Sequence, residues 1–149
     1  MDKLNIDDCL ISPLKTIPKQ GGYIKHGIKS SDFGYSGFGE LYFSSIACGV
    51  VSDWKRHNRM TMNLLVPIGE IKFCLHDQRL ESKTYGNHCC IKLGLNNYFR
   101  LTVPPKIWVA FEGIGSSDNV LANVASLEHD INEVDREPIE KFYFHKEVV

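Results

Sequence analysis

Apolar and polar residues alternate along most of the chain, a pattern that indicates β-strands because successive strand residues point to opposite faces. The clearest case is EIKFCLHD (70–77), in which Ile71, Phe73 and Leu75 share one face. The same alternation predicts strands within three further segments: ELYFSSI (40–46), CCIKLGL (89–95) and YFRLTVPP (98–105).

Turn-forming residues separate these segments at intervals of roughly 8 to 12 residues. Glycine, serine and asparagine gather in QGG, GYSGFG, ACG, PIG, LGLNN and GIGSSDN. Only EHDINEVDREPIEKF (128–142) allows a short helical turn, since Pro138 would break a long helix. The pattern predicts an all-β protein in which residues 1–149 form a single domain of the jelly-roll barrel kind.

Composition argues against several classes of function. The 149 residues are 43% hydrophobic and 23% charged with a formal net charge of -1, so no positive field favours nucleic acid or an acidic membrane surface. The longest apolar run is far shorter than the roughly 20 residues that span a bilayer. The N-terminal MDKLNIDD carries acids where a signal peptide would be basic and then apolar, and we therefore expect a cytoplasmic protein.

The five cysteines are predicted to be reduced and mostly buried thiols. No Cys-x-x-Cys pair indicates zinc or redox chemistry, and the neighbours Cys89 and Cys90 should point to opposite faces of a strand. The histidines are scattered singly, without the His-x-His pair of many metal sites. We predict no metal and no cofactor.

Candidate chemistry is concentrated in WKRHNR (54–59), which places three cations and a histidine together before a strand. Because strand residues alternate, Lys55, His57 and Arg59 should share one face while Arg56 takes the other. Imidazole titrates near neutral pH, which suits His57 to accept a proton, and guanidinium groups bind phosphates through two hydrogen bonds. A solvated surface turn would explain the same residues without any function.

Three segments together resemble the dTDP-4-dehydrorhamnose 3,5-epimerase family, small cupins that act on nucleotide-linked 4-keto sugars. They are GFGELYFSSI (37–46), WKRHNRMTMNLLVPIGEIKFCLHDQRLESKTYG (54–86) and LTVPPKIWVAF (101–111). The most specific element is an Asp-x-Arg followed by Ser-x-Thr-x-Gly, formed by Asp77, Arg79, Ser82, Thr84 and Gly86. The resemblance implies a cupin jelly-roll β-barrel with an internal active site, no metal, and a homodimer in which the N-terminal segments pair across the interface.

The resemblance also implies roles for individual residues. His57 matches the histidine that removes a proton from the carbon beside the ketone, and Phe38 and Glu40 match a Phe-x-Glu that contacts the nucleotide base. Three cations are candidates to bind the diphosphate or the enolate oxygen: Lys55, Arg56 and Arg59.

Several family positions are occupied differently in this sequence. Val109 stands where the family has a second histidine, and Met62 or Asn63 stands where it has a lysine. Ala122 and Asn123 occupy the place of the tyrosine that acts as the acid on the opposite face of the sugar. The family also has an aspartate near its C-terminus that supports the histidine, and no residue of this sequence matches that aspartate.

Two functions are consistent with these residues. One is an epimerase or isomerase that acts on a nucleoside-diphosphate 4-keto-6-deoxy sugar in surface-polysaccharide biosynthesis, with His57 as the base and the nucleotide-linked keto sugar as its only partner besides a second copy. The other is a catalytically silent cupin that binds a sugar nucleotide or a partner protein.

Overall fold

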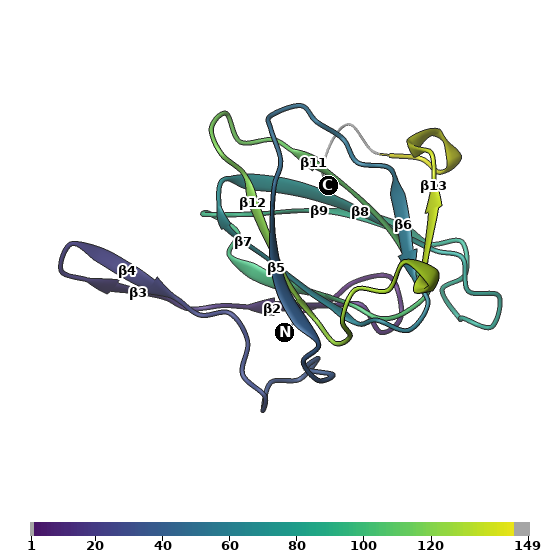
Figure 1. The fold of residues 1–149 in the computed structure, drawn as a ribbon, viewed down its shortest axis with the longest axis horizontal. Coiled ribbons are helices and arrows are strands. Elements are labelled where there is room, and N and C mark those ends of the chain that lie inside the picture. The colour runs from purple at the N-terminus through teal and green to yellow at the C-terminus, as the bar shows by residue number, and fades with distance from the viewer. Residues whose placement is uncertain (1, 145–149) are drawn as a thin grey trace.

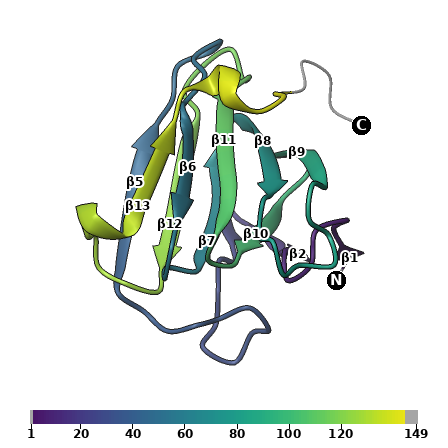
Figure 2. The same ribbon diagram turned by 90° about the vertical axis from the view of Figure 1, so that its right-hand side faces the viewer.

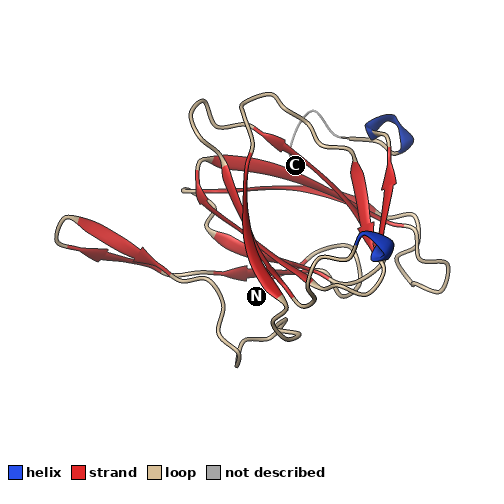
Figure 3. Ribbon diagram, viewed as in Figure 1, coloured by secondary structure: helices blue, strands red, loops and turns tan. Residues whose placement is uncertain are grey.

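Two antiparallel β-sheets face each other in the computed structural model, which describes residues 2–144 (Figures 1 and 3). Six strands form the larger sheet: β1 (Asp2–Lys3), β2 (Leu10–Pro13), β5 (Glu40–Ser45), β7 (Met62–Ile68), β10 (Phe99–Val103) and β12 (Val120–Ala125). Their spatial order is β1-β2-β10-β7-β12-β5. This is the jelly-roll architecture that the alternating pattern predicts.

The second sheet has five strands, and Figure 2 views it with its two edge strands on either side. They are β6 (Trp54–His57), β8 (Glu70–Asp77), β9 (His88–Gly94), β11 (Ile107–Gly113) and β13 (Val134–Glu137). Their order is β13-β6-β11-β8-β9. The four strands predicted from alternation are confirmed as β5, β8, β9 and β10.

A separate hairpin of β3 (Thr16–Lys19) and β4 (Gly22–Lys25) projects from the body of the molecule (Figure 1). Helical structure in residues 2–144 is limited to two 3₁₀ turns, Ile131–Glu133 and Ile139–Lys141, which flank β13. The short helical turn expected in this region is therefore confirmed. Neither turn is long or apolar enough to cross a membrane.

The inward face of β8 forms the centre of the core. Ile71, Phe73 and Leu75 are completely buried, as the alternation predicts, and pack with Leu101 of β10 in the opposite sheet. Burying an aliphatic or aromatic side chain of this size stabilises a fold by about 1.5–3 kcal/mol. This apolar layer holds the two sheets together.

The outward face of β8 is buried as well, because the segment after β13 folds over it. Phe142 and Phe144 pack against a cluster that includes Cys74 of β8. Lys72 on the same face is only 3% exposed, and its Nζ lies 2.8 Å from a carboxylate oxygen of Glu112 on β11. The ion pair compensates the ammonium group for its lost hydration.

The expectation that all cysteines are reduced is wrong for two of them. Cys74 and Cys90 form a disulfide, while Cys9, Cys48 and Cys89 are free. Cys74 and Cys90 are direct partners in the register of β8 and β9, with Cα atoms 4.1 Å apart. Sequence spacing could not show this pairing, since it depends on the strand register.

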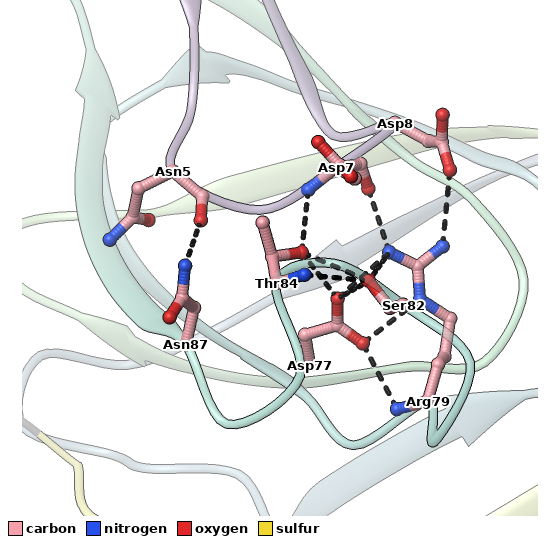
Figure 4. Close-up of polar contacts among 8 residues, drawn as sticks. All are labelled: Asn5, Asp7, Asp8, Asp77, Arg79, Ser82, Thr84 and Asn87. Carbon is pink, nitrogen blue, oxygen red and sulfur yellow. Dashed lines mark hydrogen bonds and ion pairs between the residues drawn. The ribbon is translucent and has the colours of Figure 1, made fainter.

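The residues of the Asp-x-Arg and Ser-x-Thr-x-Gly signature form one hydrogen-bonded network at the end of β8 (Figure 4). The fully buried carboxylate of Asp77 accepts hydrogen bonds from Arg79 Nε and Nη2 at 2.9 Å, and from the hydroxyls of Ser82 and Thr84 at 2.7 Å. Gly86, with a φ of 84°, donates its N–H to the carbonyl of Asp77 at 2.8 Å. A positive φ favours glycine at this turn.

The same network fixes the N-terminal segment to the sheet (Figure 4). Arg79 donates to the backbone carbonyl of Asp7 at 2.9 Å and to the carboxylate of Asp8 at 3.2 Å. The hydroxyl of Thr84 accepts from the N–H of Asp7 at 3.0 Å while it donates to Asp77. Although burial raises the pKa of Asp77, hydrogen bonds from Arg79, Ser82 and Thr84 hold it below its usual range, so the carboxyl stays ionised.

Replacing Asp77 with Asn should destabilise the protein by about 3 kcal/mol, because the guanidinium of Arg79 would lose its buried counter-charge. Urea unfolding at pH 7 measures the change, and Asp118→Asn, at an exposed carboxyl, should stay within about 0.5 kcal/mol of the parent. The lowered pKa means that the stabilisation is present above the unfolded-state pKa of about 4 and is lost as the pH falls through the folded-state pKa. Measured as a function of pH, the unfolding free energies of the parent and of Asp77→Asn should therefore converge in acid. A difference that stays constant with pH would show that the charge of Asp77 does not stabilise the fold.

Candidate functional site

One pocket lies between the two sheets and is lined by residue pairs spaced two apart on six strands. The larger sheet contributes six residues from β5, β7 and β12: Tyr42, Ser44, Met62, Leu64, Leu121 and Asn123. The smaller sheet contributes six from β6, β11 and β13: Lys55, His57, Val109, Phe111, Val134 and Arg136. His129, from the loop after β12, completes the lining. The spacing of two is the direct result of strand alternation.

His57 ends β6 and is buried, with 7% of its surface exposed. Its ring Nδ1 is hydrogen-bonded to Oε1 of Glu133, which is itself 3% exposed and lies at the end of the first 3₁₀ turn. The carboxylate accepts a hydrogen bond from Nδ1–H, so a neutral ring keeps its free lone pair on Nε2. The carboxylate therefore fixes the tautomer and the orientation of the ring.

The second oxygen of Glu133 fixes the turn that follows β6. Oε2 accepts hydrogen bonds from the backbone N–H groups of Asn58 at 3.0 Å, Arg59 at 2.8 Å and Met60 at 3.3 Å. In addition, the backbone carbonyl of Glu133 accepts from the N–H of Asn58 at 2.9 Å. One buried carboxylate thus holds both the histidine and the turn that follows it.

Glu133 remains ionised in this environment. Burial raises the pKa of its carboxyl, but the hydrogen bonds from His57 and from the backbone of Arg59 and Met60 lower it, and the net pKa lies below the usual value. A charged Glu133 would stabilise an imidazolium at His57. The resemblance to known sequences offered no match for this supporting acid, and the structure supplies Glu133 from another part of the chain.

Two cations face each other across β6 and β13 on the wall of the pocket. Lys55 and Arg136 are direct partners in the strand register, and both line the pocket. Burial and then the charge of Arg136 lower the pKa of Lys55. Neither cation forms an ion pair with a carboxylate in residues 2–144, in contrast to Lys72 on the outer face. Like charges placed opposite each other destabilise a strand pair, so this arrangement favours a bound anion.

The two predicted arginines lie elsewhere. Arg56 takes the face opposite to Lys55 and His57, as alternation requires, and its Nη2 lies 2.6 Å from Asp135. Its guanidinium also lies 4.8 Å from the ring centre of Trp108. Arg59 is paired with Asp130 at 3.2 Å in an exposed ion pair and does not line the pocket, because the strand ends before it.

The other two predicted binding residues lie near the start of β5 and do not line the pocket. Phe38 is 63% exposed in the preceding loop. Glu40 is the first residue of β5, two positions before Tyr42, and its charge is among the causes that raise the pKa of Tyr42, after burial. Glu40 therefore lies on the same strand face as Tyr42.

Sequence reasoning missed four residues that line the pocket, Tyr42, Asn123, His129 and Arg136. It also missed Glu133, which binds His57 from outside the lining. Tyr42 carried a signal, since it lies on the same face as Glu40 in a predicted strand. Arg136 lies in VDRE (134–137), a short alternating run that was read as part of a helical turn. The sequence contains no signal for Glu133, because only the folded chain brings it to His57.

No group of three or more histidine, cysteine, aspartate or glutamate side chains within residues 2–144 is arranged to hold a metal ion. His145 lies outside the described residues. The pocket contains two histidines, His57 and His129, and the first of them is engaged with Glu133. Val109, which stands where the resembling family has a second histidine, lines the pocket.

Comparison with known proteins finds three informative similarities, while no protein-family model matches the chain. A dTDP sugar isomerase from Desulfovibrio desulfuricans G20 is 34% identical, with a TM-score of 0.91 over 95% of this chain and 90% of that one. A probable low-salt glycan biosynthesis epimerase of Haloferax volcanii, Agl13, is 28% identical over 137 residues, which are 91% of this chain and 88% of the relative.

The third similarity is to the structure of dTDP-6-deoxy-D-glucose-3,5-epimerase from Legionella pneumophila Philadelphia 1, in complex with dTDP-4-keto-L-rhamnose. It is 18% identical, with a TM-score of 0.80 over 89% of this chain and 74% of that one. At this identity the likeness supports the fold alone. The first similarity, by contrast, combines sequence and structure over nearly the whole of both chains.

Proposed function

Because the chain belongs to the family of dTDP-sugar epimerases and isomerases that includes dTDP-4-dehydrorhamnose 3,5-epimerase, we propose that it is an epimerase or isomerase of a nucleoside-diphosphate 4-keto-6-deoxy sugar. The pathway we propose is the synthesis of a surface polysaccharide or glycan, the role named for the Haloferax relative. The observation that carries the proposal is the buried His57–Glu133 pair inside the pocket.

In the proposed reaction His57 removes the proton from the carbon beside the ketone. The C–H bond breaks, its electron pair enters the enolate, and the proton moves to Nε2 of His57. Glu133 holds the ring in place and stabilises the imidazolium, as a positioning residue. The catalytically silent alternative gives no reason for a histidine and a carboxylate to be buried together in a pocket, since burying two such groups costs several kcal/mol.

Lys55 and Arg136 supply the positive charge that the reaction needs. A nucleotide-linked keto sugar carries negative charge on its diphosphate and, transiently, on the enolate oxygen. The two unpaired cations on the pocket wall are better placed for such charge than Arg56 and Arg59, which already have carboxylate partners. Binding of an anion would also relieve their mutual repulsion across the strands.

We also propose that the protein is a homodimer in the cytoplasm. The hairpin β3–β4 projects from the body and exposes Tyr23 (58%) and Ile24 (47%), which a lone chain would leave in water (Figure 1). An isolated two-stranded hairpin is only marginally stable, so a partner surface would account for its form. In the single chain β1 pairs with its own β2, and the hairpin rather than β1 is therefore the part that would reach a second copy.

Replacing His57 with Asn should slow proton exchange beside the ketone by a factor of about 100 or more, the usual contribution of a general base. The measurement is deuterium incorporation from D₂O into 4-keto-6-deoxy sugars linked to dTDP, UDP, GDP or CDP, followed by mass spectrometry. His26→Asn, outside this pocket, should exchange at the parental rate. Equal rates for His57→Asn and parent would exclude His57 as the base, and no exchange by the parent with any sugar would favour the silent cupin.

A nucleoside diphosphate should raise the melting temperature by about 5–10 °C at 100 times its dissociation constant. Lys55→Gln and Arg136→Gln should each remove most of this shift, because each loses a charged contact to the diphosphate. Arg56→Gln and Arg59→Gln are the matched controls and should keep it. If the shift were instead lost in Arg56→Gln and Arg59→Gln and kept in Lys55→Gln and Arg136→Gln, the diphosphate would bind to Arg56 and Arg59.

Light scattering on a dilute solution should give a mass of twice the 16.9 kDa of one chain. The double variant Tyr23→Lys and Ile24→Lys should be monomeric, since two charges would be buried in the proposed interface. Leu95→Lys, at a residue that is 69% exposed in another turn, should remain dimeric. A monomeric parent protein would contradict the proposal.

A further inference from the structure

The two walls of the pocket differ in their chemistry. His57, Lys55 and Arg136 come from the five-stranded sheet. The six-stranded sheet contributes Ser44, Met62, Leu64, Leu121, Asn123 and Tyr42. Of these six side chains only Tyr42 has a proton that an enzyme can transfer near neutral pH. Among the strand residues of the pocket, His57 is the candidate base on one wall and Tyr42 the candidate acid on the other, while His129 lines the pocket from the loop after β12.

Tyr42 is held in a defined orientation by the neighbouring strand. It is the register partner of Asn123, whose side-chain Nδ2 donates a hydrogen bond to the phenol oxygen at 2.8 Å. Because the phenol oxygen accepts this bond, its own proton is free to be donated to a ligand. Burial raises the pKa of Tyr42, which keeps the phenol protonated at neutral pH.

Asn123 provides a second and independent sign that this wall contacts a ligand. The residue is 2% exposed, it lines the pocket, and its Oδ1 has no hydrogen-bond partner within residues 2–144. Leaving a buried carbonyl oxygen unpaired is unfavourable. A hydroxyl group of a bound sugar would supply the missing donor.

Inversion of a carbon requires that a proton leave from one face and that another arrive at the opposite face. We propose that Tyr42 is a catalytic residue that donates its phenol proton to the enolate carbon on the face opposite His57, and that the protein is therefore an epimerase rather than an isomerase that moves the ketone along one face. This inference rests on the proposed function.

The proton balance of the step is complete. The O–H bond of Tyr42 breaks, a new C–H bond forms with the electron pair of the enolate, and the ketone is restored. Tyr42 is left as a phenolate that still accepts the hydrogen bond from Asn123, while His57 carries the proton removed in the first half. Exchange of both groups with solvent returns the enzyme to its starting state, so no further reactant is needed.

The test is to measure exchange and inversion together in the Tyr42→Phe variant. The variant keeps the ring and loses only the hydroxyl. In D₂O, the parent should incorporate deuterium and form inverted sugar, whereas Tyr42→Phe should form inverted sugar about 100-fold more slowly while His57 still exchanges deuterium at the carbon with its original configuration. Tyr85→Phe, at a tyrosine that is 50% exposed outside the pocket, should match the parent in both.

The possible failures are distinguishable. Inversion by Tyr42→Phe at the parental rate would overturn the role of Tyr42 and leave His57 and the proposed function intact. Loss of both exchange and inversion, in a variant that melts within a few degrees of the parent, would assign Tyr42 to the first step and also overturn the inference. Absence of both reactions in the parent, with every sugar of the panel, would contradict the proposed function itself.

Discussion

The carboxylate of Glu133 is the interaction on which the rest of the site depends. It binds the ring of His57 with one oxygen and the backbone of residues 58–60 with the other. The strand that follows, β13, then pairs with β6 from Val134 to Glu137 and so brings Arg136 opposite Lys55. A single contact between distant parts of the sequence therefore fixes His57, the turn beside it and both cations of the pocket.

The sequence was sufficient to predict the all-β fold and the shared face of Lys55 and His57. Alternation is a local property, so it identified the buried face of β8 and placed Lys55 and His57 on one side with Arg56 on the other. The extension of this face to Arg59 did not hold, because β6 ends at His57 and alternation ends with it. The Cys74–Cys90 disulfide and the contact of Glu133 depend on register and on chain return, which no local pattern specifies.

Opposite faces of the same sheet deal with charge in different ways. On the outer face Lys72 is paired with Glu112, and Arg56 with Asp135, so the charges there are compensated within the protein. On the inner face Lys55 and Arg136 have no such partners in the part of the chain that the structure describes. Compensated charges stabilise or solubilise a fold, while uncompensated ones in a pocket await a ligand. This contrast, more than the number of cations in the sequence, supports the inner face as the proposed binding face.

A barrel site specifies where a functional group must be in space, and several strands can deliver it there. Ala122 and Asn123 of β12 stand where the resemblance would place a tyrosine, and the register places Tyr42 of β5 directly beside Asn123, with the two side chains hydrogen-bonded. The supporting acid is likewise a glutamate from a 3₁₀ turn rather than an aspartate from the expected position. Residue-by-residue matching along the sequence therefore underestimates what this pocket contains, because neighbouring strands of an antiparallel sheet bring partners to within hydrogen-bonding distance regardless of their separation in the chain.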